Sequence, residues 1–241
     1  MLGLAAEPYD VTKDSSLVKV SCIVPAYNEG SRIEAVLRVL TTHPLIDEII
    51  VVDDCSTDDT VKISTAFDAV KVMRSSRNAG KTHALSVGFA AASGQIYLLI
   101  DADLTGLDAS ALTALLRPVL DDRADMTISL RRNAPNLWHM IGIDYISGER
   151  VFRRDLVARQ VCDLDDLPPF GFEVWLNSVA IAAATRISIV PWHHVESPAK
   201  SVKRGLARGL FADLRMVVDM VRTVTPSRLI HQIVALRRLM T

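Results

Sequence analysis

Residues 95–103 read Gln-Ile-Tyr-Leu-Leu-Ile-Asp-Ala-Asp, an apolar run that ends in two aspartates one residue apart. Such a run predicts a strand buried on both faces, as in a parallel sheet covered by helices. In open α/β sheets, ligands bind at the carboxyl ends of the strands, which is where Asp101 and Asp103 fall. Two neighbouring carboxylates repel each other and favour an added cation. Their hard oxygen atoms suit Mg²⁺ or Mn²⁺, so we expect a divalent metal here.

The chain on either side of this run alternates between apolar strands and amphipathic helices. The patterns predict strands at 18–25, 48–53, 70–74, 95–101, 126–130 and 187–191, and helices at 31–42, 58–67, 81–92 and 108–120. Strands that alternate with helices of this length form a mainly parallel, doubly wound α/β sheet. This alternation predicts one α/β domain, for which 241 residues are sufficient.

We divide the chain into three parts. Residues 1–17 are a polar N-terminal arm, 18–199 form the α/β domain, and 200–241 form a basic amphipathic helical tail. The formal net charge of the chain is −1, which disfavours a nucleic-acid binder. The tail, however, holds nine Lys or Arg residues and two Asp residues, a local charge of +7.

The tail interleaves its basic residues with apolar ones, a pattern typical of a helix lying on an anionic membrane. Packing on the catalytic domain or on a second copy of the chain in a homodimer is the alternative. Three widely spaced cysteines and a start unlike a signal peptide lead us to expect a reducing, cytoplasmic location. Peripheral contact with the inner face of the membrane agrees with this expectation.

An isolated Asp-x-Asp triplet is better explained by helix capping and a salt bridge, but this triplet occurs together with other polar motifs. Three more polar segments follow predicted strands: residues 24–29 (Val-Pro-Ala-Tyr-Asn-Glu), 51–60 (Val-Val-Asp-Asp-Cys-Ser-Thr-Asp-Asp-Thr) and 77–81 (Arg-Asn-Ala-Gly-Lys). In order and spacing, these segments resemble the family 2 glycosyltransferases of GT-A fold. The likeness is strongest to the polyprenyl-phosphate sugar synthases and their soluble relatives. It is strong over residues 18–131 and looser over 145–192.

The resemblance implies a GT-A fold and transfer of a sugar from a nucleoside-diphosphate sugar to an acceptor, with residues 18–131 binding the nucleotide sugar and 132–199 the acceptor. The residues expected to line the donor pocket are Pro25, Ala26, Tyr27, Glu29, Asp53, Asp54, Gly80, Lys81, Asp101 and Ala102. Asp54 is expected to accept a hydrogen bond from the base. Gly80 would let the backbone approach the phosphates, and Lys81 would meet phosphate charge or lie near Asp101. A solvated surface lysine is the alternative for Lys81.

Asp101 and Asp103 are the metal ligands that the resemblance implies. Retaining glucosyl- and mannosyl-phosphoglycerate synthases, which the segment around Glu173 resembles, use a late histidine as a further ligand. His194 is the candidate here, with a hydrogen-bonded surface histidine as the alternative.

The catalytic base of an inverting transfer must be a carboxylate, and Glu173 is the candidate. It follows Phe170-Gly171-Phe172 at an expected helix start, where a stabilising charge at the helix N-terminus is the alternative explanation. Arg150 and Arg153 are expected to meet an acceptor phosphate, and a solvated basic face is their alternative. The acceptor would be a lipid phosphate or a small phosphorylated molecule. Glu173 as base implies inversion, whereas a role for His194 would agree with retention.

Two residues depart from the family pattern. Cys55 stands where the family usually has glycine, and Thr105 stands where polyprenyl-phosphate synthases often have glutamine. Two other classes stay open, a sugar nucleotidyltransferase and a non-catalytic scaffold. The first would need a Gly-rich, basic loop after the first strand, where Pro-Ala-Tyr-Asn-Glu stands instead. The second would have little reason to keep both Asp101 and Asp103.

Overall fold

The computed structural model of the chain describes residues 18–158, 164, 167–168, 171–198 and 226–241. The described residues form one sheet of seven strands in the order β3-β2-β1-β4-β6-β5-β7. The strands are β1 (Val20–Ala26), β2 (Glu48–Asp53), β3 (Val70–Arg74), β4 (Ile96–Leu99), β5 (Met126–Arg131), β6 (Arg150–Arg153) and β7 (Ile187–Trp192). The first four are parallel, and β7 is parallel to β5. The mainly parallel α/β fold is therefore confirmed.

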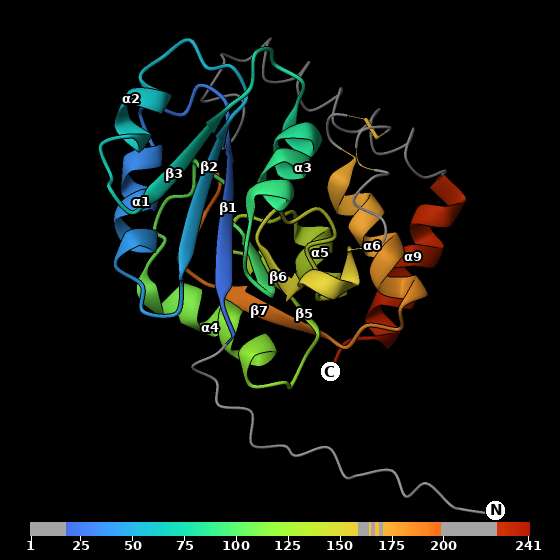
Figure 1. The fold of residues 1–241 in the computed structure, drawn as a ribbon. Helices are drawn as coiled ribbons and strands as arrows, with labels where there is room; N and C mark the ends of the chain where they lie inside the picture. Colours follow the sequence, from blue (N-terminus) through green and yellow to red (C-terminus); the bar gives the residue numbers. More distant parts are fainter. Residues whose placement is uncertain (1–17, 159–163, 165–166, 169–170, 199–225) are drawn as a thin grey trace, which may run out of the picture.

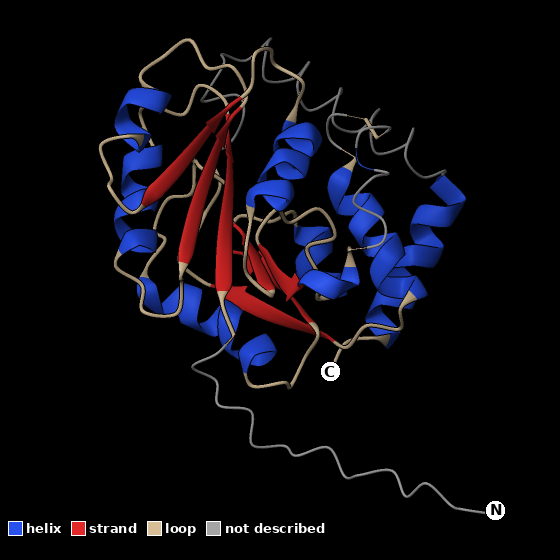
Figure 2. Ribbon diagram, viewed as in Figure 1, coloured by secondary structure: helices blue, strands red, loops and turns tan. Residues whose placement is uncertain are grey.

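Helices cover both faces of the sheet (Figures 1 and 2). They are α1 (Ile33–Thr41), α2 (Thr60–Ser64), α3 (Lys81–Ala91), α4 (Ala109–Leu120), α5 (Asn136–Ile141), α6 (Phe172–Ala182) and α9 (Pro226–Arg238), with a 3₁₀ turn at Arg154–Leu156. Residues from α1 and α4 join the core on one face, and residues from α3, α6 and α9 join the core on the other. Because both faces are buried, the strands carry the continuous apolar runs seen in the sequence.

Strand β6 is an element that the sequence patterns did not predict. It consists of Arg150, Val151, Phe152 and Arg153, and it lies antiparallel between β4 and β5. Two of its four residues are charged, so its sequence lacks the apolar run that marked the other strands. Its register pairs Arg150 with Leu99, the last residue of β4. The segment that precedes β6 is therefore delivered to the carboxyl end of β4.

The last helix belongs to the domain rather than to a separate tail. Helix α9 packs on α6, and its Leu236 is fully buried in the core on that face. The amide of Thr241 also donates to the carbonyl of Ile187 at 2.9 Å. Residues 1–17 and 200–225 of the predicted arm and tail lie outside the described residues. Within the described part of the chain, no helix is both long enough and apolar enough to cross a bilayer.

Candidate functional site

The loops that follow β1 and β2 are tied into one unit at the carboxyl edge of the sheet. The amide of Asn28 donates to Ser56 Oγ, and Asn28 Oδ1 accepts from the amide of Thr57, both at 2.8 Å. Asn28 adopts a positive φ of 55°, which asparagine tolerates better than most residues. The amide of Glu29 donates to Thr60 Oγ1, also at 2.8 Å. These bonds fix the two loops that the sequence assigned to the donor pocket.

Within the first loop, the predicted donor-pocket residues differ in accessibility. Ala26 is buried, whereas Tyr27 is 36% exposed. The carboxylate of Glu29 forms an ion pair with Arg32 at 3.4 Å, and Pro25 is half-buried at the end of β1. Tyr27 therefore presents an aromatic side chain at the edge of the sheet, where the sequence predicts the nucleotide.

Asp54 anchors the loop before α3. Its side chain is buried, and its two oxygens accept from the amides of Ala79 and Gly80 at 2.9 and 2.7 Å. Gly80 adopts a φ of 95°, which favours glycine. The predicted contact between Asp54 and a base stays a prediction, since each carboxylate oxygen accepts one backbone amide and can accept a second hydrogen bond. Its neighbour Asp53 is also buried and accepts from the amide of Ser56.

Cys55, the residue that departs from the family pattern, has a φ of 63°. This left-handed conformation is the one that glycine adopts most easily. The structure therefore gives a backbone reason for the glycine expected at this position. Cys55 keeps the conformation while its Sγ lies 3.7 Å from the carbonyl of Ser76.

Lys81 joins the predicted metal ligand Asp101 to the predicted base Glu173. Its ammonium nitrogen lies 2.7 Å from Asp101 Oδ1 and 2.9 Å from Glu173 Oε1. All three side chains are largely buried, with exposed fractions of 19% for Lys81, 24% for Asp101 and 10% for Glu173. Burial alone would lower the pKa of Lys81, but the two carboxylates outweigh it and hold that pKa above its usual value. Lys81 is thus not a solvated surface residue, and the prediction that it lies near Asp101 is confirmed.

Gly148 comes closer to this ion-pair network than any side chain would allow. A Cβ atom placed there would lie 2.5 Å from Lys81 Nζ, and 2.7 and 2.8 Å from the two oxygens of Asp101. Only glycine therefore fits without displacing the network. The dipeptide Ser147-Gly148 was the only sequence signal for this contact, and it did not reveal which residues would meet.

The Asp101-Ala102-Asp103 segment follows β4 directly, and Asp103 is 8% exposed. Across the described residues, no group of three or more His, Cys, Asp or Glu side chains could hold a metal by itself. Mg²⁺ and Mn²⁺ do not require such a group, because they commonly bind one or two carboxylates, substrate phosphates and waters. The two carboxylates therefore fit an ion that is shared with a phosphate ligand.

His194 is not brought together with the two aspartates as the predicted third ligand. Its Nε2 lies 3.0 Å from Asp108 Oδ2, and both side chains are about half exposed. Asp108 in turn caps α4 by accepting from the amide of Ala111 at 2.8 Å. The alternative of a hydrogen-bonded histidine describes the structure better than the ligand role does.

The predicted acceptor contact of Arg150 is corrected. Arg150 is fully buried, and its guanidinium donates to Asn177 Oδ1 and to the carbonyls of Tyr145 and Ser147. Burial lowers the pKa of Arg150 against the opposing effect of nearby carboxylates, Glu173 first. Its donors hold α6 and residues 145–147 together, so they are not directed at an acceptor.

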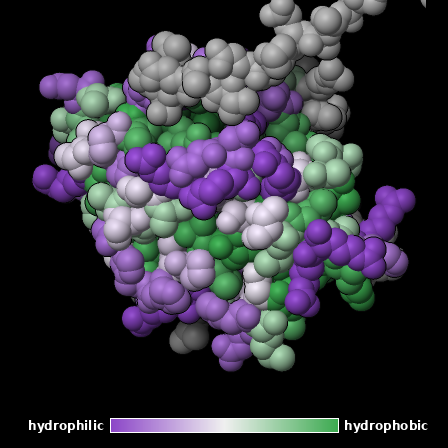
Figure 3. All heavy atoms as spheres, turned by 90° about the horizontal axis from the view of Figure 1, so that it is seen from below, coloured by the Kyte–Doolittle hydropathy of each residue, from purple (hydrophilic) through white to green (hydrophobic). Residues whose placement is uncertain are grey.

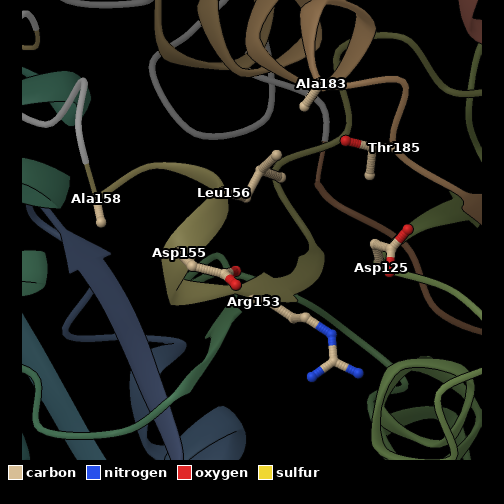
Figure 4. Close-up of a pocket in the computed structure, with 7 residues that line it drawn as sticks. All are labelled: Asp125, Arg153, Asp155, Leu156, Ala158, Ala183 and Thr185. Carbon is tan, nitrogen blue, oxygen red and sulfur yellow. The ribbon is translucent and has the colours of Figure 1, made fainter. Parts of the chain in front are cut away.

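Arg153 lies at the opposite edge of the sheet, where the structure corrects its predicted role as well. It pairs with Ile96, the first residue of β4, and forms an ion pair with Asp122 at 2.7 Å. Figure 4 shows it in the lining of a 490 Å³ cavity that Asp125 and Thr185 also line. Figure 3 views the molecule from this amino edge, which a band of hydrophilic residues crosses. Arg153 therefore lies at the edge opposite to Lys81, Asp101 and Glu173.

A second buried cluster of charges, which the sequence did not indicate, lies beside the Lys81 network. Arg131, the last residue of β5, contacts Asp144 Oδ2 at 2.9 Å and Glu149 Oε2 at 3.5 Å. Burial would lower the pKa of Arg131, but Glu149 and Asp144 hold it above its usual value. Burial also raises the pKa of Glu149, which Arg131 opposes and Asp101 reinforces. The two clusters are therefore electrostatically linked.

A family model described as "Glycosyl transferase family 2" matches residues 21–157, more than half of the chain. Dolichol-phosphate mannosyltransferase of Pyrococcus furiosus is 37% identical over 92 residues, 36% of this chain and 26% of that protein. Glucosyl-3-phosphoglycerate synthase of Mycobacterium tuberculosis is 36% identical over 109 residues, 42% of this chain and 34% of that protein. The chain thus spans about a third or less of either relative.

A crystal structure of the Mycobacterium tuberculosis glucosyl-3-phosphoglycerate synthase, in complex with Mn²⁺, uridine diphosphate and phosphoglyceric acid, superposes with a TM-score of 0.70. The alignment covers 87% of this chain and 79% of that one at 24% identity. At this level of identity, the match establishes a shared fold.

Proposed function

Because the chain belongs to glycosyl transferase family 2, we propose that it transfers a sugar from a nucleoside-diphosphate sugar to a phosphate-bearing acceptor, using Mg²⁺ or Mn²⁺. Asp101 and Asp103 would hold the metal, and the loops after β1, β2 and β3 would hold the nucleotide. The observation that carries this proposal is the meeting of Lys81, Asp101 and Glu173 at the carboxyl end of the sheet. A ligand-binding carboxylate, a phosphate-binding cation and a candidate base lie there within one network.

The donor side follows from the backbone of residues 79–81. Asp54 fixes this loop by accepting from the amides of Ala79 and Gly80. Gly80 directly precedes α3, and Lys81 is the first residue of that helix. The first amides of a helix and a lysine both favour an anionic diphosphate. When bound, the metal would neutralise charge on the departing diphosphate. The Lys81 ammonium lies 2.7 Å from Asp101, a proposed metal ligand. It would therefore lie near the diphosphate and add to that neutralisation.

Glu173 would accept the proton of the acceptor on a carboxylate oxygen as the new bond forms. It is the first-turn acid of α6, and its Oε1 is held by Lys81 at 2.9 Å. Attack from the face opposite the diphosphate would invert the anomeric centre. An NMR assignment of the product's anomeric configuration decides between inversion and retention.

A phosphate on the acceptor is supported by the names of the relatives. A dolichol-phosphate mannosyltransferase and a glucosyl-3-phosphoglycerate synthase both carry a phosphorylated acceptor or product in their names. We propose a lipid phosphate as the first candidate, because the chain ends in a segment of local charge +7. Incubation with donor and either a polyprenyl phosphate or 3-phosphoglycerate distinguishes the two, since only the true acceptor accelerates nucleoside diphosphate release.

Helix α9 supports peripheral contact with an anionic membrane. Ile230 and Val234, one helical turn apart, are 65% and 46% exposed, and Arg237 and Arg238 close the helix. Exposed apolar residues flanked by basic ones are typical of helices that bind anionic lipid. We expect the full chain to sediment with anionic but not with neutral vesicles. Equal sedimentation with both, or a concentration-dependent dimer that Ile230→Asp dissociates, would contradict the membrane contact.

The donor is tested by a thermal-shift screen of UDP- and GDP-sugars with and without Mn²⁺. A ligand that binds only the folded chain raises its apparent stability, by about 2.7 kcal/mol at 100 times its dissociation constant. We expect a shift that needs both sugar nucleotide and metal, and slow release of the diphosphate. Pyrophosphate release from a sugar phosphate and a nucleoside triphosphate would indicate nucleotidyl transfer instead. No shift and no release would favour a scaffold.

A further inference from the structure

Residues 144–149, here called the strap, run into β6 at the carboxyl end of β4. An acid stands at each end of the strap, Asp144 and Glu149, and both are fully buried. Both contact the guanidinium of Arg131, with Asp144 Oδ2 at 2.9 Å and Glu149 Oε2 at 3.5 Å. The two ends of the strap are thus tied to one side chain at the end of β5.

Glu149 carries most of this attachment. Its Oε2 also accepts from Ser129 Oγ at 2.9 Å and from Ser147 Oγ at 2.8 Å. The two serine oxygens also lie 2.7 Å apart and complete a ring of close contacts with that oxygen. When both hydroxyls donate to Glu149, neither donates to the other. Ser129 belongs to β5 and Ser147 to the strap. One buried carboxylate oxygen therefore joins the strap to the neighbouring strand β5.

The middle of the strap lies against the proposed metal and donor site. Gly148 stands between Ser147 and Glu149, both of which belong to the ring. Its backbone lies so close to Lys81 and Asp101 that a Cβ there would come within 2.5 to 2.8 Å of their charged atoms. Any shift of the strap would therefore change the positions of the Lys81 and Asp101 side chains.

We propose that Glu149 is a positioning residue for the metal and donor site. It holds the strap, and the strap sets how Asp101 and Lys81 face the metal and the diphosphate; this inference rests on the proposed function. A buried carboxylate is costly, and its attachment to Arg131 and two serines offsets that cost. Replacing a residue that orients a metal ligand typically costs 10- to 100-fold in metal affinity or activity.

The test is Mn²⁺ binding to the full chain in the presence of UDP or GDP, measured by calorimetry in the wild type and in Glu149→Gln. Glutamine keeps the size of the side chain and a carbonyl acceptor for the serines, but it removes the charge that Arg131 contacts. We expect the Mn²⁺ dissociation constant to rise about tenfold while the thermal unfolding transition stays cooperative. The effect should reappear as a raised donor KM with a smaller change in kcat.

Glu48 provides the matched control. Its Oε2 accepts from Ser21 Oγ at 2.5 Å and from Ser93 Oγ at 3.2 Å, at the opposite end of the sheet. Glu48→Gln removes a charge from the same Glu-Ser-Ser arrangement, and it should leave Mn²⁺ affinity unchanged within about twofold, since distant sites act independently. An equal loss in both variants would show a general effect on stability and overturn the positioning role.

Ser129→Ala is the second variant, in case Glu149→Gln does not fold. It removes one donor from the ring and leaves every charge in place, so we expect a smaller loss of Mn²⁺ affinity in the same direction. Wild-type affinity in either folded ring variant would overturn this inference alone. Absence of Mn²⁺ binding in the wild type would overturn the proposed metal-dependent function and this inference with it.

Discussion

Each end of the sheet has a glutamate that accepts from serine hydroxyls, but the pKa values of the two glutamates are shifted in opposite directions. Glu149 at the carboxyl end and Glu48 at the amino end each accept from two serine hydroxyls. At Glu48, partial burial would raise the pKa of the carboxyl group, but hydrogen bonds from Ser21 and Ser93 outweigh it and hold that pKa below its usual value. At Glu149, complete burial dominates and raises the pKa. Complete burial at Glu149 is reinforced by Asp101, whereas partial burial at Glu48 is outweighed by hydrogen bonds that include the Ser93 amide, so the two pKa values are shifted in opposite directions.

This contrast extends to the charged residues at each end of the sheet. At the carboxyl edge, Lys81, Asp101 and Glu173 are shielded from water and hold one another. At the amino edge, the pairs that Asp122 makes with Arg153 and Arg186 are exposed to water. Ion pairs contribute little in water and much where water is excluded. Substitutions at the carboxyl edge should therefore have the larger consequences.

The largest effect is expected for Asp103→Ala. It removes one of the two proposed metal-binding carboxylates, so Mn²⁺-dependent binding of nucleoside diphosphate should fall below detection. The loss should exceed the 10- to 100-fold typical of residues that only orient a ligand. Calorimetry with UDP and GDP, with and without Mn²⁺, measures it. Unchanged binding in a folded variant would remove the metal site from this edge of the sheet.

Glu173→Gln should reduce turnover while leaving the donor site intact. Loss of a general base typically costs about 10²- to 10⁴-fold in rate. Glutamine keeps a carbonyl oxygen for the Lys81 ammonium, so Mn²⁺ and donor affinity should change little. Steady-state kinetics with the acceptor identified by the screen gives kcat and KM separately. Full kcat would show that another group removes the proton.

The pH dependence of stability should change in opposite directions in the two glutamate variants. A raised pKa, as at Glu149, contributes stability at low pH that is lost as the pH rises from about 4.5 through the folded-state value. A lowered pKa, as at Glu48, contributes stability above about 4.5 that is lost as the pH falls through the folded-state value. The cost of Glu149→Gln should therefore shrink with rising pH, whereas that of Glu48→Gln should grow.

Urea unfolding of both variants and the wild type, from pH 4 to pH 7, measures these two slopes. Parallel slopes in the two variants would contradict the contrast between the two ends of the sheet. A slope that differs from the wild type only in Glu48→Gln would show that the pKa of Glu149 is the same in the folded and the unfolded chain.

The smallest effect is expected for Arg153→Ala at the amino edge. It breaks an ion pair with Asp122, whose side chain is 72% exposed, and such pairs contribute about 0 to 1 kcal/mol. The free energy of unfolding should fall by no more than this, and the acceptor KM should stay the same. A raised acceptor KM would restore the acceptor role that the sequence suggested for Arg153.

The sequence was most informative where a segment carries its own pattern. The predicted strands at 48–53 and 70–74 agree with β2 and β3 residue for residue, because an apolar run, as in β2, or an alternation of apolar and charged residues, as at the start of β3, can be recognised without knowing its neighbours. The sequence did not predict strand β6, because a charged residue such as Arg150 is expected at the surface, whereas here it is buried. It is held by Asn177, 27 residues away, and no local pattern reports such a partner.

The candidate site shows the same division. The sequence singled out Asp101, Lys81 and Glu173 one by one, but Lys81 contacts partners that lie 20 and 92 residues away in the chain. It missed Arg131 and the contact of Glu149 with it, and it did not reveal the backbone partners of Asp54, because a carboxylate in a loop looks alike whether it faces a ligand or its own backbone. Only the folded positions of Ala79 and Gly80 show that the backbone is the partner.

By itself, the sequence determined the alternation of strands and helices and the edge at which chemistry would gather, because side-chain polarity and its period act over neighbouring residues. The tertiary structure alone decided which charges are buried, which carboxylates meet a lysine and which meet a backbone amide. Electrostatic energies depend on distance and on exclusion of water, and both are properties of the packed chain. That is why one arrangement, a glutamate with two serines, lies near solvent at Glu48 and beside the proposed active site at Glu149.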